Sequence, residues 1–281
     1  MAQSRVTVSE TPSLFSLIIR AIAFWLRNQM TFWVLVLPIV ALAAIAAHIV
    51  GTFDQFAFLR HPEAWDFLFA LIYAMFLDRW IKEALLEDAT ECDEVDAFRR
   101  ALVPAPLLLF TIVVLLFAMA LSWLRLQGIE LNLRRAGLSH DATAILAAVV
   151  AWLPHLLVWA TAVTFFALLL PAWCAGQRPS LRQNWRTSAP VRGKLFRLIA
   201  GATALSLVSY AMTNWGLEAM PYKRWVPAAM LGAQRLVDLL LLAIVGHVLA
   251  TLFRVLTDWQ QPEPEERPFR GRGARKPATS G

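Results

Sequence analysis

Residues Val226–Leu256 read VPAAMLGAQRLVDLLLLAIVGHVLATLFRVL and contain only three formal charges, on Arg235, Asp238 and Arg254. A helix needs about 20 mostly apolar residues to cross the hydrocarbon core of a bilayer, so this stretch predicts a transmembrane helix. The rest of the chain is similar: its 281 residues are 58% hydrophobic and 16% charged, whereas a soluble domain carries about 25% charged residues. The composition therefore indicates a polytopic membrane protein.

Five further apolar stretches have the length of a membrane span. They are Phe32–Val50, Pro62–Trp80, Ala101–Trp123, Ala144–Trp173 and Leu195–Trp215. The second has the shortest uninterrupted apolar core, and we count it because the number of spans is odd without it. We expect an all-α, polytopic six-helix transmembrane bundle over residues 1–259, with short cytoplasmic amphipathic helices. Residues 260–281, rich in Pro, Glu, Gly and Arg, predict a disordered cytoplasmic tail.

Lys and Arg are divided unequally between the gaps that separate these spans. Nineteen of the 26 lie before the first span, in the gaps after the second and fourth spans, and in the tail, whereas six lie in the other gaps. Because cytoplasmic loops of membrane proteins carry an excess of Lys and Arg, both termini are predicted to be cytoplasmic. Several Trp residues fall near the predicted span ends, which is typical of an aromatic belt.

The segment Ser13–Met30 precedes the first span and has the pattern of an amphipathic helix. Ser13, Ser16, Arg20 and Arg27 fall on one helical stripe, and apolar residues cover much of the remainder. Such a helix would lie in the headgroup plane, where its cations would suit an anionic leaflet. The alternative is a helix that packs against the bundle and leads into the first span.

The gap after the fourth span predicts a second short amphipathic helix. Ser180 is a good N-cap, Leu181 and Trp185 lie one turn apart, and Pro190 ends the turn. An ordinary positive-inside loop is the alternative, but it does not explain the cap or the apolar spacing. The candidate contacts to anionic headgroups or a partner protein are Arg20, Arg27, Arg178, Arg182, Trp185, Arg186, Arg192, Lys194 and Arg197.

The gap after the second span is acidic, with six carboxylates between Glu87 and Asp96. An EF-hand would need ligands at alternating positions and a turn Gly, which this stretch lacks, so we expect no metal site. A solvated acidic helix is the simplest interpretation. A more specific hypothesis is that this segment faces the cations between Arg178 and Arg197, since both gaps are predicted to be cytoplasmic.

Two further patterns concern helix packing. Ala228 and Gly232, and likewise Gly246 and Ala250, are small residues spaced four apart, which lets helices approach closely within one chain or between chains. The tripeptide Pro-Ser-Leu occurs at residues 12–14 and again at residues 179–181. This suggests a repeated unit of one inner helix followed by a transmembrane hairpin.

Arg235 and Asp238 are the ionisable residues deepest in a predicted span, and a spacing of three puts them on one helical face. Charged residues inside a membrane mark functional sites by default. A structural ion pair is the favoured interpretation, because Asp238 can neutralise Arg235 locally. A small-solute permease or channel that uses the pair is the alternative. His247 lies nine residues from Asp238, which is half a turn away at 100° per residue, so the two cannot form one proton path on a straight helix.

The sequence lacks the metalloprotease, nucleophile-elbow and Walker A signatures. We therefore predict no catalytic residue, no cofactor and no bound metal, and we expect no nucleic-acid partner. A homo-oligomer or a membrane-protein partner is compatible with the small-residue patterns.

The junction of the fourth and fifth spans resembles a known loop. Pro171, Gly176, the run Arg178–Leu181, Trp185 and Gly193 occur in an order similar to that of bacterial six-span proteins. These include the membrane domain attached to some glycerophosphoryl diester phosphodiesterases and the uncharacterised YciC-like proteins. The resemblance implies a bacterial inner-membrane location and no catalytic residue. We therefore expect a non-enzymatic scaffold or accessory protein whose cationic cytoplasmic rim engages anionic lipid or a partner protein.

Overall fold

The computed structural model describes residues 12–52, 62–87, 157, 160–161, 163–219 and 226–259, and every regular element in this part of the chain is helical. The helices are α1 (Leu14–Arg27), α2 (Gln29–Thr52), α3 (Pro62–Leu85), α7 (Leu169–Cys174), α8 (Leu181–Ser188), the 3-10 turn η3 (Ala189–Val191), α9 (Arg192–Ala219) and α10 (Val226–Thr257). The predicted all-helical class is confirmed for these residues.

Four of the six predicted spans fall within long helices, α2, α3, α9 and α10. The predicted span 101–123 and most of 144–173 lie outside the described residues. Within the described part, Gln29–Ala46 and Ala228–Thr257 are long and apolar enough to cross a membrane. Length and apolar composition are also found in the core helix of a soluble protein, so they do not by themselves place a helix in a bilayer.

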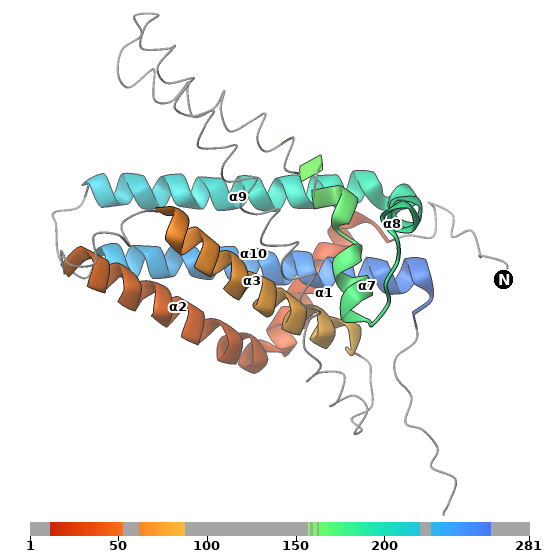
Figure 1. Cartoon of the computed structure of the whole chain (residues 1–281), viewed down its shortest axis with the longest axis horizontal. Coiled ribbons are helices and arrows are strands. Elements are labelled where there is room, and N and C mark those ends of the chain that lie inside the picture. Colours follow the sequence, from red (N-terminus) through yellow and green to blue (C-terminus); the bar gives the residue numbers. More distant parts are fainter. Residues whose placement is uncertain are drawn as a thin grey trace, which may run out of the picture.

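Helix α10 is the centre of the arrangement and packs against α1, α2, α3, α7 and α9. Figure 1 shows α2, α3, α9 and α10 running side by side along the long axis, with α2 and α9 directed opposite to α3 and α10. Helices α1, α7 and α8 gather where α9 begins and α3 and α10 end (Figure 1). We call this part the α8 end.

Glycine allows α10 to approach its two neighbours closely. A Cβ placed on Gly232 would meet Val40 Cγ1 at 3.5 Å and Ala44 Cβ at 3.7 Å, both on α2. A Cβ on Gly246 would meet Leu77 Cδ2 of α3 at 3.3 Å. These two predicted small-residue contacts therefore form within one chain.

The first helix begins and ends at residues whose side chains satisfy free backbone groups. Ser13 caps α1 by accepting a hydrogen bond from the Ser16 N–H at 3.1 Å. Asn28 ends it, because its N–H bonds to the carbonyls of Phe24 and Trp25 and its side chain donates to Phe24 O. Helix α1 thus stops at Arg27, before the Met30 boundary that the amphipathic pattern predicted.

Helix α1 buries Leu17, Ala21 and Phe24 against the bundle, as the packed-helix alternative requires. It also leaves apolar side chains uncovered, since Phe15 is 73% exposed and Leu26 is 51% exposed. The helix therefore has an inner apolar face against the protein and an outer surface on which apolar and cationic residues mix.

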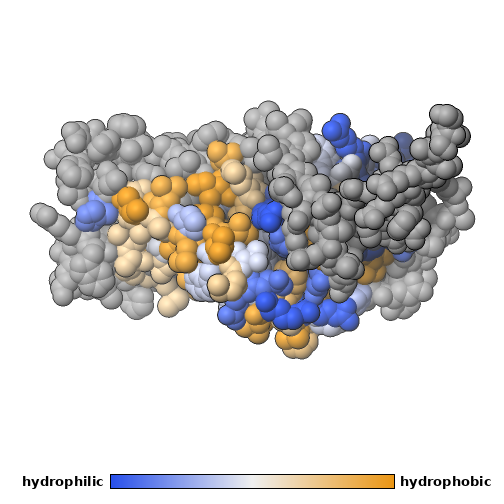
Figure 2. All heavy atoms as spheres, turned by 90° about the horizontal axis from the view of Figure 1, so that it is seen from below, coloured by the Kyte–Doolittle hydropathy of each residue, from blue (hydrophilic) through white to orange (hydrophobic). Residues whose placement is uncertain are grey.

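The core is mainly apolar, but large apolar side chains are also exposed and several polar side chains are buried. Exposed apolar stripes follow α2 and α9; they consist of Val34, Leu37, Leu42 and Ile45, and of Leu205, Val208 and Met212. Buried polar side chains include Asp78, Lys82, Gln234 and His247. In Figure 2 orange and tan residues gather left of centre, and most blue residues lie to the right.

Candidate functional site

The predicted pair in α10 is part of a larger polar network that joins three helices. Asp238 accepts a hydrogen bond from the Ser206 hydroxyl of α9 at 2.6 Å and from Gln234 Nε2 at 3.2 Å. The Tyr73 hydroxyl of α3 lies 3.4 Å from Asp238 Oδ2, and Arg235 Nη1 lies 3.7 Å from the same oxygen. Asp238 therefore accepts its shortest hydrogen bond from another helix, not from Arg235.

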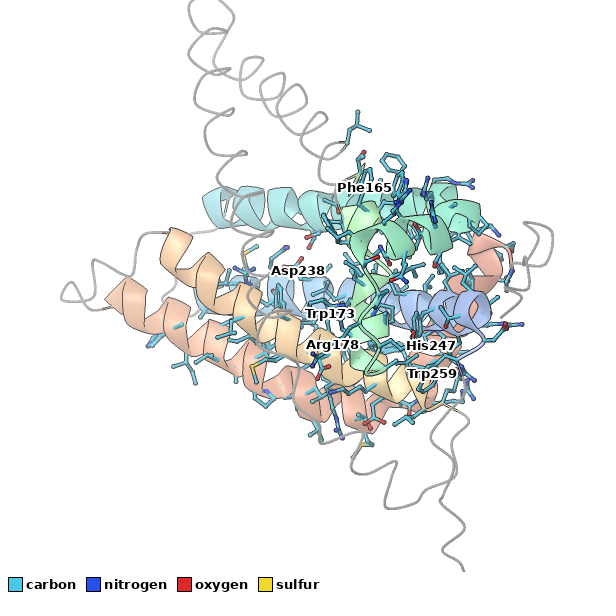
Figure 3. All side chains as sticks on the ribbon, turned by 45° about the vertical axis from the view of Figure 1, so that its right-hand side comes forward. Phe165, Trp173, Arg178, Asp238, His247 and Trp259 are labelled. Carbon is cyan, nitrogen blue, oxygen red and sulfur yellow. The ribbon has the colours of Figure 1, made fainter. Side chains whose placement is uncertain are left out.

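A second contact extends this network along α9. The Ser209 hydroxyl donates to Gln234 Oε1 at 2.8 Å, so Gln234 connects Ser209 to the carboxylate of Asp238. Polar groups that bond across helices satisfy each other where water is excluded. The network therefore fixes the register of α9 and α3 on α10. Figure 3 shows Asp238 and His247 well apart along α10.

A buried ion pair lies where α3 meets α7. Lys82 Nζ donates to Asp78 Oδ2 at 2.9 Å, and the side chains of Lys82 and Asp78 are 2% and 12% exposed. Cys174 Sγ lies 3.3 Å from Asp78 Oδ1. Burial, together with the neighbouring Asp78 carboxylate, raises the pKa of the Cys174 thiol well above its usual range. Cys174 is thus a protonated structural donor at neutral pH.

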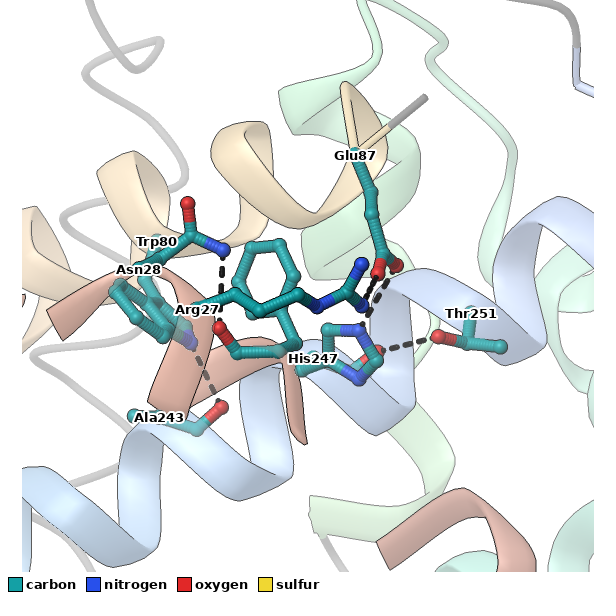
Figure 4. Close-up of polar contacts among 8 residues, drawn as sticks. Arg27, Asn28, Trp80, Glu87, Ala243, His247 and Thr251 are labelled. Carbon is teal, nitrogen blue, oxygen red and sulfur yellow. Dashed lines mark hydrogen bonds and ion pairs between the residues drawn. The ribbon is translucent and has the colours of Figure 1, made fainter. Parts of the chain in front are cut away.

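A third charged cluster lies at the α8 end. It joins α1 and α10 through Glu87, which lies two residues after the end of α3. Glu87 pairs with Arg27 through Oε1 and lies 3.3 Å from His247 Nε2 through Oε2 (Figure 4). The Phe24 ring lies over the His247 ring, with centroids 4.6 Å apart. Trp80 Nε1 donates to Ala243 O at 2.9 Å beside them. We call Arg27, Glu87 and His247 the α1 junction.

The α1 junction gives Glu87, the first residue of the acidic segment, other partners than the predicted ones. Glu87 was expected to face the cations between Arg178 and Arg197, but its partners are Arg27 of α1 and His247 of α10. That part of the hypothesis is wrong for Glu87, because Arg27 and His247 occupy its two carboxylate oxygens. Residues 88–96 lie outside the described part of the chain.

Helix α8 begins as predicted. The Ser180 hydroxyl accepts from the Gln183 N–H at 3.2 Å, and the Gln183 side chain accepts from the Ser180 N–H at 2.8 Å, which forms a capping box. Gly176, at φ 76°, allows the turn that follows α7. Helix α8 ends at Ser188, and Pro190 lies in the 3-10 turn before α9.

Several predicted lipid contacts take part in packing at the α8 end. Trp185 stacks on Phe165, with centroids 3.9 Å apart and planes 8° apart, and the Arg192 guanidinium covers the Trp185 ring 3.1 Å from its centroid. Lys194 Nζ donates to Pro12 O at 2.9 Å and thereby joins the start of α1 to α9. Arg197 donates to Gly193 O at 3.0 Å.

Four predicted contact residues stay open to the surroundings. Arg20, Arg178, Arg182 and Arg186 are exposed and have no ion-pair partner within the part of the chain that the structure describes. Leu181, beside Arg182, is 62% exposed. From here on, the term cationic rim means these four arginines together with the two exposed apolar side chains on α1 and α8, Phe15 and Leu181. Contact of the cationic rim with lipid or a partner protein stays a prediction.

Sequence reasoning missed the buried pair and most of the α10 network. The Lys and Arg residues after the second predicted span, Lys82 among them, were counted only as a topology signal, although Asp78 and Lys82 are four residues apart, a spacing that brings opposite charges together on one helical face. Tyr73, Ser206 and Gln234 carried a weaker signal, as polar side chains within apolar helices. Their convergence depends on how α3, α9 and α10 pack, which no single helix specifies.

Within the described ranges, no group of three or more His, Cys, Asp or Glu side chains is placed to hold a metal ion. No family model, curated protein or solved structure matches the chain.

Proposed function

We propose that this chain is a non-enzymatic integral protein of a bacterial inner membrane, a scaffold or accessory whose cationic rim engages anionic lipid. The observation that carries the proposal is the set of large apolar side chains exposed along α2 and α9, together with charged and polar side chains buried among the helices. Val34, Leu37 and Met212 are 69%, 56% and 65% exposed on the outer faces of α2 and α9, whereas Lys82 and His247 are buried. Burial of one large apolar side chain contributes about 1.5–3 kcal/mol, so lipid would stabilise a surface that water would not.

The cationic rim supplies the second half of the proposal. Arg178, Arg182 and Arg186 are exposed in the segment that contains the exposed Leu181, and Arg20 and Phe15 are both exposed on α1. An apolar side chain inserted at the headgroup boundary with arginines around it is the usual chemistry of an interfacial helix. Each arginine near an anionic leaflet contributes about 1 kcal/mol. The lipid partner best supported is therefore an anionic phospholipid.

The orientation of the helices agrees with the charge pattern. The ends of α3 and α10 and the start of α9 lie together at the α8 end (Figure 1). These are the termini next to the gaps in which Lys and Arg are concentrated. We propose that the α8 end is cytoplasmic. Reporter fusions at Gln183 should then read cytoplasmic and fusions at Gly137 extracytoplasmic, and the reverse reading would contradict the topology.

A small-solute permease that uses Arg235 and Asp238 has less support. The Asp238 oxygens accept from Ser206 and Gln234 and face Arg235, so protein groups already satisfy the carboxylate that a solute would need. The suggested kinship with the six-span bacterial group stays a proposal that rests on the loop motif alone.

Lipid retention tests the proposed function directly. Purified protein is placed in mixed micelles, and bound phosphatidylglycerol and phosphatidylcholine are counted by native mass spectrometry. The wild type should retain phosphatidylglycerol preferentially. Replacing Arg178, Arg182 and Arg186 together with Gln should remove about 3 kcal/mol of attraction, which weakens retention on the order of 100-fold.

The matched control changes the same number of charges elsewhere. Arg125, Arg134 and Arg135 lie in a gap predicted to be on the opposite side of the membrane, and their replacement with Gln should leave retention close to wild type. Equal losses in both triple variants would show that net charge alone attracts the lipid. An unchanged result in the Arg178, Arg182 and Arg186 variant would remove the cationic rim from the proposal.

A further inference from the structure

Within the proposed lipid-binding function, on which this inference rests, we infer that Arg27 is a headgroup-phosphate site for which Glu87 is the built-in competitor. Anionic lipid would exchange with Glu87 for the guanidinium of Arg27 and so loosen the last turn of α1. The inference begins from the α1 junction, where one carboxylate serves two partners through different oxygens. Arg27 lies on Oε1 and His247 lies 3.3 Å from Oε2 (Figure 4).

Exposure divides the α1 junction into an outer and an inner part. The Arg27 side chain is 65% exposed, the Glu87 side chain 20% and the His247 side chain 3%. A lipid phosphate can therefore reach Arg27 without opening the bundle. Arg27 also lies five residues before the predicted first span, which corresponds to the headgroup level.

The free energy needed to separate Arg27 from Glu87 is small. An exposed ion pair shifts an equilibrium by no more than about fivefold. Guanidinium groups bind phosphate oxygens through paired, charge-assisted hydrogen bonds, and an anionic leaflet presents phosphates at high local concentration. A lipid phosphate can therefore compete with Glu87 for Arg27. The fraction of Arg27 bound to phosphate should rise with the anionic lipid content.

The contact with His247 means that Glu87 is not left without a partner when lipid takes its place at Arg27. When Arg27 leaves, Glu87 still faces His247 Nε2, so the carboxylate retains a partner. The buried Leu17, Ala21 and Phe24 continue to hold α1 on the bundle. Phe24 lies in the last turn and stays buried, so what loses support is the exposed side of that turn at Arg27 and the link to α2 through Asn28, whose N–H bonds to the carbonyls of Phe24 and Trp25. The response is thus confined to the connection between α1 and α2.

The first test measures phosphatidylglycerol binding by native mass spectrometry for Glu87→Gln, Arg27→Gln and the double variant. Glu87→Gln keeps an oxygen for His247 but releases Arg27, so it should bind phosphatidylglycerol about two- to fivefold more tightly than wild type. Arg27→Gln should bind it more weakly. The double variant should match Arg27→Gln, because Glu87 acts only through Arg27.

Glu83→Gln is the matched control. Glu83 lies one turn before Glu87 and pairs with Arg79 at 3.1 Å, so its replacement makes the same charge change on the same segment without touching Arg27. Its binding should equal that of wild type. Equal gains in Glu83→Gln and Glu87→Gln would overturn the inference, because they would show a general electrostatic effect.

The second test follows hydrogen exchange of the peptide Trp25–Met30 in nanodiscs. In the wild type, exchange should be faster in phosphatidylglycerol than in phosphatidylcholine, and in Glu87→Gln it should be fast in both. Slow exchange in Glu87→Gln would overturn the proposed loosening. If the Arg178, Arg182 and Arg186 variant loses lipid while the Glu87 and Arg27 variants behave as wild type, the exchange at the α1 junction is wrong and the proposed function stands. If the wild type shows no preference for phosphatidylglycerol, both fail.

Discussion

Replacement of Lys82 with Met should be among the most damaging single changes in the described helices. Lys82 is 2% exposed and its Nζ lies 2.9 Å from Asp78 Oδ2. Methionine fills a similar volume, so the packing around position 82 is largely kept. The change therefore isolates one effect: the buried carboxylate of Asp78 loses its cation and keeps the Cys174 thiol, a weak donor.

The expected loss of unfolding free energy is about 3–5 kcal/mol, the usual result of removing one partner from a buried pair. The variant Asp78→Asn with Lys82→Met carries neither charge and should recover at least about 2 kcal/mol, because no uncompensated ion remains.

Unfolding free energies from SDS titration of the detergent-solubilised protein would measure these differences. Arg79→Gln is the matched control on the same helix: its partner Glu83 is 13% exposed, much like Asp78, but Arg79 itself is 36% exposed, so water can replace the guanidinium that the change removes. A partly exposed pair contributes about 0–1 kcal/mol. If Lys82→Met costs no more than Arg79→Gln, or if the double variant is as unstable as the single one, the pair does not carry the stability assigned to it.

Three further outcomes follow from the packing. Arg235→Leu and Asp238→Leu should each cost about 3–5 kcal/mol. The double variant should recover only part, because Ser206 and Gln234 lose their acceptor; full recovery in SDS titration would contradict the network. Gly246→Leu should cost about 1–3 kcal/mol by overpacking against α3, whereas Gly201→Leu, with open space around Gly201, should leave the melting temperature unchanged. Because burial raises its pKa, the Cys174 thiol should resist iodoacetamide in the folded protein and react after unfolding in SDS. Rapid labelling of the folded state, followed by peptide mass spectrometry, would contradict this.

Local patterns predicted the helices well because each depends on nearby residues. The apolar runs placed α2, α3, α9 and α10, and Ser180 with Gln183 supplied the cap at α8. The limit of α1 was missed because it depends on the Asn28 side chain, which competes with the helix for the Phe24 carbonyl.

The polar clusters were harder to predict because they depend on separations of many residues. Tyr73 meets Asp238 across 165 positions, and Glu87 meets His247 across 160. Periodicity shows which face of a helix is buried but not which neighbour covers it. The sequence therefore identified Arg235 and Asp238 as a pair, and only the packed helices reveal the groups around them.

The central place of α10 has a consequence for how the chain matures during synthesis. Helices α1, α2 and α3 all pack against α10, which follows α3 by about 140 residues in the sequence. The packing of these early segments is therefore incomplete until α10 has been synthesised. Contacts between such distant segments slow assembly and prolong the exposure of unpartnered surfaces. Nascent chains stalled before Val226 should accordingly be targets for chaperones and proteases, because α1, α2 and α3 still lack their contacts with α10.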